Sequence, residues 1–107
     1  MISRIWHGWT TRSNADAYER LLREEILVVI AGRGIAGFQG IDLLRSNRAD
    51  EVEFVTIMWF DTMQAVRDFA VGEDYEAAVV PPAAQRLLAR FDARSAHYEV
   101  VETHLDD

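Results

Sequence analysis

The chain has neither cysteine nor lysine among its 107 residues. Without cysteine there can be no disulfide, thiolate nucleophile or cysteine-ligated metal. Without lysine there can be no Schiff base and no P-loop lysine. No apolar run approaches the roughly 20 residues that span a bilayer. The opening residues, MISRIWHGW, contain no apolar signal segment, so we expect a cytoplasmic protein without a membrane anchor.

Positive charge is also scarce. The 11 basic residues are all arginine and face 18 acidic residues, which gives a net charge of -7. An acidic chain without a basic stripe is poorly suited to bind nucleic acid or an anionic membrane. Half of the residues are hydrophobic, which is enough for a buried core. The length predicts a single domain that covers residues 1–107.

The order of secondary structure follows from the periodicity of apolar residues and from turn residues. Two helices are expected, the first after Ser13 and Asn14 and the second after Asp61 and Thr62. Strands are expected over residues 2–10, 36–46, 51–60 and 94–103.

Three segments need separate interpretation. The β-branched run ILVVI at 26–30 is predicted to end the first helix, because Gly32 and Gly34 follow it. Gly37 and Gly40 indicate a bulge or a close backbone approach in the second strand. Before the last strand we expect a helical turn at 73–80 and a helix that Pro82 starts, AAQRLLARF.

The resulting order β-α-β-β-α-β is typical of the ferredoxin-like α+β sandwich. Its four strands form one antiparallel sheet, and both helices cover the same face. In this arrangement we expect the first and last strands not to be adjacent. The strands carry apolar residues on both faces, so the uncovered face predicts a homodimer with the two sheets packed face to face.

Four segments, at 4–10, 59–70, 74–81 and 96–101, reinforce this interpretation. They read RIWHGWT, WFDTMQAVRDFA, DYEAAVVP and AHYEVV, and the chain resembles the antibiotic biosynthesis monooxygenase (ABM) domains of the dimeric α+β barrel superfamily. The resemblance implies one of several activities. Some members oxygenate polycyclic phenols to quinones without metal or flavin, others degrade haem, and others resemble isomerases, decarboxylases or ligand-binding dimers.

The haem-degrading branch makes a specific demand. The resemblance implies an Asn on the first strand, a Trp on the second helix and an axial His on the short helix that follows. Here the first strand has no Asn, Phe69 matches the Trp position, and the His position falls near Val79. Haem degradation is therefore disfavoured. We expect no cofactor and no metal site, since the histidines lack metal-ligand spacing.

Aromatic residues and histidines supply the candidate site. We predict a flat slot for a small apolar or aromatic ligand, lined by Trp6, His7, Trp59, Phe69 and Tyr75. The alternative for each aromatic residue is a place in the core or the dimer interface.

The candidate catalytic base is His97, because imidazole is the natural base near neutral pH. Its alternative is a half-buried, hydrogen-bonded strand residue. Arg4 is a candidate to bind a phenolate or carboxylate, and its alternative is an ion pair with an acidic neighbour on the next strand.

Three functions remain open at this point. The first is a cofactor-independent monooxygenase that acts on a small planar phenolic or polycyclic substrate. The second is a non-catalytic dimeric module that binds a small ligand or has a structural role. The third is a lactone isomerase or related lyase that uses the same pocket without oxygen.

Overall fold

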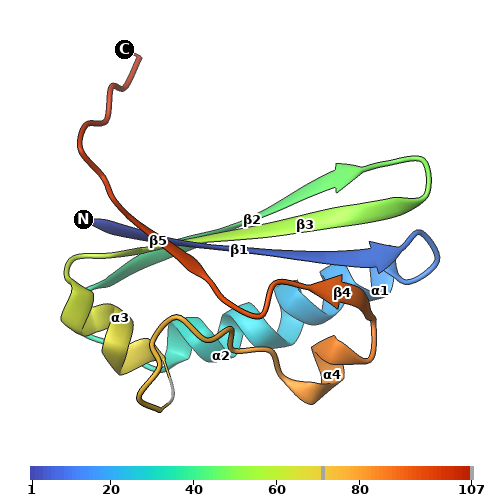
Figure 1. Ribbon diagram of the computed structural model, residues 1–107, viewed down its shortest axis with the longest axis horizontal. Helices are drawn as coiled ribbons and strands as arrows, with labels where there is room; N and C mark the ends of the chain where they lie inside the picture. The colour runs from blue at the N-terminus through green and yellow to red at the C-terminus, as the bar shows by residue number, and fades with distance from the viewer. Residues whose placement is uncertain (71, 107) are drawn as a thin grey trace.

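The computed structural model describes residues 1–70 and 72–106 (Figure 1). Within them, no helix combines the length and apolar character needed to cross a bilayer. The elements, in chain order, are β1 (Ile2–Thr11), α1 (Ala15–Leu21), the π-helix η1 (Leu22–Ile26), α2 (Leu27–Gly32), β2 (Phe38–Asn47), β3 (Glu51–Phe60), α3 (Met63–Phe69), α4 (Pro82–Gln85), β4 (Leu88–Phe91) and β5 (Ala96–Glu99).

The strands form one antiparallel sheet in which β1 is central. The order is β2-β3-β1, and the far edge of β1 pairs with β4 at one end and β5 at the other. Figure 1 shows all the helices on one side of this sheet. The predicted ferredoxin-like α+β fold is confirmed, with five strands because the last strand of the pattern is split into two.

The segment before the last strand differs from the prediction. The helix that begins at Pro82 ends at Gln85, and Leu88–Phe91 forms β4. Residues 73–80 contain no helix and instead make a bridge between Ala77 and Arg94. Pairing with the free edge of β1 therefore outweighs the helix propensity of LLARF.

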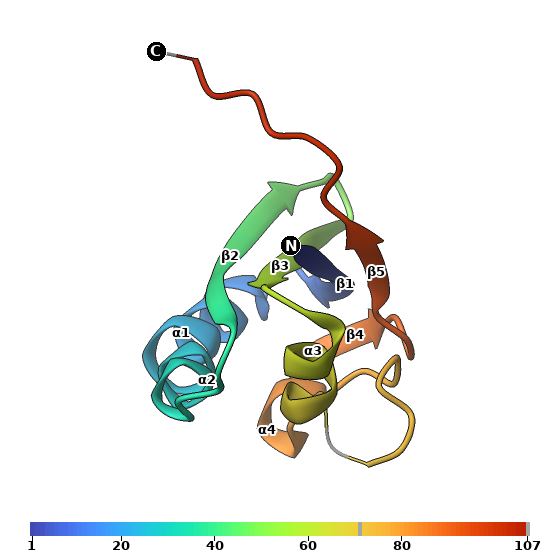
Figure 2. The same cartoon turned by 90° about the vertical axis from the view of Figure 1, so that its left-hand side faces the viewer.

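The expected separation of the first and last strands is wrong. β5 pairs directly with β1, and Arg4 stands opposite His97 in the register. In a split β-α-β fold the final strand returns to the free edge of the first strand, as Figure 2 shows for β5 beside β1. This adjacency brings together two residues that are 93 positions apart.

Alternation along β1 separates the two faces of the sheet. Arg4 and Trp6 point toward the helices and are buried, whereas Ile5, His7 and Trp9 point to the opposite face and are partly exposed. The core under the helices consists of two clusters. One surrounds the Tyr18–Phe54 ring contact, and the other surrounds Phe60 and Phe69.

The helical roof runs without a break from α1 through η1 to α2. The prediction that ILVVI completes the first helix is confirmed, because α2 ends at Gly32 and Gly34 follows with a positive φ of 66°. None of the residues in α2 is fully buried, and Val28 and Val29 are exposed. α2 therefore packs only loosely on the core and exposes apolar side chains to solvent.

The glycine-rich start of β2 contains the expected bulge and close approach. The register shifts between Phe38 and Gly40. Gly37 has φ 88°, and a Cβ at this position would lie 2.9 Å from the Cβ of Ala65. Only glycine lets the chain turn here while α3 packs against the turn.

Replacing Gly37 by Ala should therefore lower the free energy of unfolding by about 1 to 3 kcal/mol, from the positive φ and the contact with α3 together. Gly32→Ala is the matched control. Gly32 is the last residue of α2, and nothing lies within 4 Å of the Cβ that the substitution adds. Urea unfolding of both variants measures the difference. Equal stability of the two variants would contradict this account of the bulge.

Candidate functional site

A small cavity lies between the sheet and the helical roof. Arg4, Trp6 and Thr56 line it from the sheet, and Leu22 and Ile30 line it from the helices. It encloses about 60 Å³, which is room for a few water molecules. The cavity is therefore too small to contain a polycyclic ring system.

An apolar cleft of about 360 Å³ adjoins this cavity. Val29 on α2, Phe69 on α3, and Val79 and Pro81 in the following loop line the cleft. Phe69, Val79 and Pro81 also line the inner cavity, so the two spaces share a wall. The volume of the cleft falls within the usual range for small-molecule sites.

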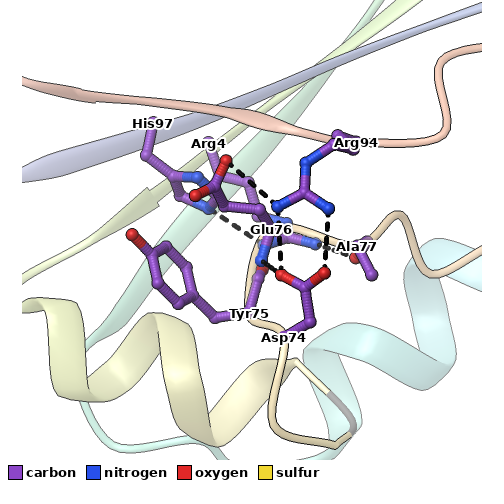
Figure 3. A network of polar contacts seen from close by, with 7 residues as sticks. All are labelled: Arg4, Asp74, Tyr75, Glu76, Ala77, Arg94 and His97. Atoms are coloured by element: carbon purple, nitrogen blue, oxygen red, sulfur yellow. Dashed lines mark hydrogen bonds and ion pairs between the residues drawn. The ribbon is translucent and has the colours of Figure 1, made fainter.

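Arg4 forms the polar inner end of the cavity. Its side chain is only 3% exposed. Nη1 donates to the carbonyl of Tyr75 at 2.6 Å, and Nη2 donates to the carbonyl of Ala77 at 3.0 Å (Figure 3). Its guanidinium carbon also lies 5.3 Å from the ring centre of Phe69. The backbone of the 75–77 loop thus holds the cation in one position.

Arg4 has no acidic partner in the part of the chain that the structure describes. Within residues 1–70 and 72–106, no Asp or Glu forms an ion pair with it, so the predicted ion pair with an acidic neighbour is wrong. Its cross-strand neighbours are Met58 and His97. Burial lowers the pKa of Arg4, yet a guanidinium stays charged at neutral pH. Three of its five N–H donors are engaged, which leaves two for a ligand.

His97 is the third group that holds Arg4. Its Nε2 lies 2.9 Å from Nη1 of Arg4. Arginine cannot accept a hydrogen bond, so Nε2 is the acceptor and the imidazole is neutral, with its proton on Nδ1. Burial and then the charge of Arg4 lower the pKa of His97, while Glu76 acts in the opposite direction. The Tyr75 ring packs edge-on against it at 5.3 Å.

The loop that carries these carbonyls is also fixed from outside. Arg94 contacts Asp74 at 2.8 Å and Glu76 at 3.4 Å, and the backbone N–H of Ser95 donates to the Glu76 carbonyl at 2.7 Å (Figure 3). The Arg94 contact lowers the pKa of Asp74. The loop therefore lies between two arginines, the buried Arg4 and the surface Arg94.

The predicted site residues fall into three groups. Trp6 and Phe69 line the cavity, and the Trp6 indole N–H is already bound to the Asp92 carbonyl at 2.8 Å. Tyr75 and His97 contact each other and Arg4, but neither of them lines the cavity. His97 is a half-buried strand residue that is hydrogen-bonded to Arg4, which is the alternative given for it, and its role as a base stays a prediction.

Trp59 and His7 lie elsewhere. Trp59 alternates with the fully buried Phe60, so it points to the uncovered face of the sheet. His7 is on that same face, where its Nδ1 is 2.9 Å from Glu53. The single slot drawn from the sequence therefore divides into a cavity on one face and an aromatic surface on the other.

Sequence reasoning missed three polar residues of the cavity wall, Tyr18, Thr56 and Ser95. Tyr18 stands one turn before Leu22, at the spacing typical of an apolar helix face. Burial raises the pKa of its phenol, so the hydroxyl stays protonated and can act as a donor. Helical spacing to Leu22 was the available signal, but spacing does not distinguish a core tyrosine from a cavity tyrosine.

Comparison with known proteins identifies the fold. No family model matches the sequence, and no curated protein matches it. Among solved structures, a Bacillus cereus protein named as a candidate antibiotic biosynthesis monooxygenase aligns with a TM-score of 0.69 at 13% identity, over 98% of this chain and 97% of that one. MhuD, the haem degrader of Mycobacterium tuberculosis with two haems in its active site, aligns with a TM-score of 0.58 at 17% identity, over 97% and 99%.

These likenesses confirm the fold that the resemblance to ABM domains implies. Haem can be tested against the residues themselves. In the described part of the chain, the residues that line the cavity and the cleft include no histidine, and no three His, Asp or Glu side chains are placed to hold a metal. Val79 contributes an apolar wall near the expected axial position. The site therefore does not fit a haem iron that needs an imidazole ligand.

The lowered pKa of His97 predicts a pH-dependent stability. The folded state keeps this imidazole neutral, whereas the unfolded chain takes up a proton below its usual pKa of 6.5. The free energy of unfolding should therefore fall as pH decreases from about 6.5 through the lower folded-state pKa. His97→Gln keeps an acceptor for Arg4 but cannot bind a proton. Urea unfolding from pH 5 to 8 should show that the free energy of unfolding falls less on acidification in this variant than in the unaltered protein. The same pH dependence in both proteins would contradict the neutral imidazole.

Proposed function

We propose that the chain binds the ionised form of a small planar phenol or anthrone-like molecule and oxygenates it with O₂, without metal or flavin. The observation that supports this most is the buried, uncompensated Arg4 at the inner end of an apolar cavity. A cation in a site of low polarity favours an anionic ligand strongly. The two similar folds are consistent with this function class.

Arg4 would stabilise the phenolate. Its two remaining N–H groups can donate to one oxygen, and charge-assisted hydrogen bonds of this kind are short and strong. The effect lowers the pKa of a bound phenol. The apolar walls, including Phe69 and Ile30, keep water out and maintain the strength of this interaction.

His97 would receive the proton. Its Nε2 lone pair faces Nη1 of Arg4, so it lies next to the position where the ligand oxygen would bind. A phenolate at Arg4 cancels the positive charge that, after burial, lowers the pKa of His97. If Nη1 of Arg4 then donates its N–H to the phenolate oxygen instead of to Nε2, the freed lone pair of Nε2 can take the proton. Arg4 and His97 together would thus split a hydroxyl into a bound anion and a stored proton.

The oxygenation itself then needs an electron-rich carbon and O₂. The ring carbon that is CH₂ in the neutral keto form, and CH in the ionised ligand, becomes C=O. One oxygen atom of O₂ enters the product, and the other leaves as water together with the hydrogen on that carbon and the proton held by His97. The four electrons lost by the carbon reduce O₂ fully, so no further reductant is required. The protein supplies orientation and a dry cavity.

The dimensions set how the ligand lies. A ring system fits the cleft but not the cavity, so its acidic edge would pass Phe69 to reach Arg4 while the rings rest against Val29, Val79 and Pro81. This position leaves much of the ring surface in apolar contact.

A binding module without catalysis is the second candidate. One observation favours it: the cavity wall carries Arg4, while His97 stands behind it and is absent from the lining residues. Such a module would bind the same anions and consume no oxygen.

We also propose that the working unit is a homodimer. The uncovered face of the sheet presents Ile5, Trp9, Val55, Ile57 and Trp59 as a partly exposed apolar surface. A second copy laid on this face would bury it, as the aromatic content of the surface favours.

An oxygen-dependent product is the expected outcome for the enzyme. Purified protein incubated with anthrone should give anthraquinone in air and none without oxygen, measured by chromatography and an oxygen electrode. Arg4→Gln should lower kcat/KM roughly 10-fold to 100-fold, because it removes the charge that stabilises the anion.

Arg4→Lys is the control for folding and charge. It keeps the cation but loses the planar fork, so partial activity is expected. His97→Gln should bind a pre-ionised phenol yet turn over slowly. Binding of the phenol without oxygen uptake would contradict the monooxygenase function and support the binding module.

Trp59→Glu tests the dimer. The change places a charge in the middle of the apolar surface, so sedimentation should show a folded monomer where the unaltered protein is a dimer. Arg86→Glu, outside this surface, is the control and should stay dimeric. A monomeric unaltered protein at micromolar concentration would contradict the proposed assembly.

A further inference from the structure

Arg33 is a second cation that borders the same ring as Arg4. It follows the last residue of α2 and reaches across to the end of α3. Its Nη1 donates to the Phe69 carbonyl at 3.1 Å and its Nη2 donates to the Asp68 carbonyl at 3.3 Å. The guanidinium carbon lies 5.2 Å from the Phe69 ring centre. Arg33 lines the cleft, with Phe69 between it and the inner cavity.

Arg4 and Arg33 share the same mode of support. Backbone carbonyls fix each of them, and in the described residues neither forms an ion pair with a carboxylate. By contrast, Arg45, Arg90 and Arg94 all pair with acidic side chains. Arg33 uses two of its five N–H donors on the carbonyls, so three remain free. Its charge is held in place and is not neutralised.

The other residues that line the cleft determine how an anionic ligand would be oriented in it. Its walls are mostly apolar, and Glu25 is its one acidic lining residue. Glu25 precedes Arg33 by eight residues on the same helical run, which is about 12 Å along the axis. An anionic group of a ligand would therefore be repelled from the Glu25 end and attracted to the Arg33 end.

We propose that the ligand is a hydroxy-aromatic acid, whose hydroxyl binds Arg4 in the cavity and whose carboxylate binds Arg33 at the rim of the cleft. This rests on the proposed function, because it assumes that Arg4 binds the acidic hydroxyl. The flat ring system between the two groups lies along Phe69. Because Arg4 lines the inner cavity and Arg33 lines the cleft, the hydroxyl and the carboxylate would occupy opposite ends of the rings.

The contribution of Arg33 should be modest and sensitive to salt. It is solvent-exposed, and exposed ion pairs change affinity by up to about fivefold. Screening weakens such a pair as ionic strength rises. These properties separate direct contact with the ligand from a purely structural role in holding the end of α3.

The test compares two fluorescent probes, 2-naphthol and 6-hydroxy-2-naphthoate, which differ by one carboxylate opposite the hydroxyl. Dissociation constants are measured without oxygen for the unaltered protein, Arg33→Gln and Arg86→Gln. The naphthoate should bind about threefold to fivefold more tightly than naphthol at low salt. Arg33→Gln should erase this ratio, and Arg86→Gln, which lines a different surface, should keep it.

The two proposals fail in different ways. If naphthol binding depends on Arg4 but the carboxylate adds no affinity, the role of Arg33 is overturned and the proposed function stands. A ratio that survives Arg33→Gln also overturns it. If neither probe binds, or if binding ignores Arg4→Lys and Arg4→Gln alike, the proposed function itself fails. The ratio is internal to each variant, so a general loss of stability does not imitate the expected result.

Discussion

The contact between Arg4, two backbone carbonyls and a neutral imidazole is the interaction on which the site depends. It joins β1 to β5 and to the 75–77 loop, and among the described residues no carboxylate forms an ion pair with this cation. A buried cation is costly unless its hydrogen bonds are met. The carbonyls of Tyr75 and Ala77 and the lone pair of His97 meet them only in part, which leaves the cation able to bind an anion.

The two faces of the sheet carry different features of the molecule. The face under the helices carries the core, the cavity and Arg4, while the opposite face carries the apolar and aromatic surface around Ile57 and Trp59. The helical roof over the cavity contains the π-helix η1 and ends in the exposed α2. Such π segments are frequent at functional sites, and here η1 contributes Leu22 and Ile26 to the cavity wall.

Much of the fold could be predicted from local patterns. The strands at 2–10 and 51–60 and the bulge near Gly37 all follow from residue type and spacing. The site was less accessible, because it depends on pairing between distant segments. Leu88–Phe91 is a strand only because β1 offers a free edge. The predicted slot grouped Trp59 with Trp6 and Phe69, although Trp59 lies on the opposite face of the sheet. A one-residue error in parity exchanges the faces, and composition carries no information about it.

The most direct measurement is the ionisation state of a phenol bound to the protein. The absorption spectrum of bound 2-naphthol, titrated with pH, gives the pKa of the ligand in the site. If Arg4 acts as proposed, that pKa is lower than in water, and the shift shrinks in Arg4→Gln. A bound pKa equal to or above the value in water would show that the ligand does not meet the charge of Arg4, and would contradict the account.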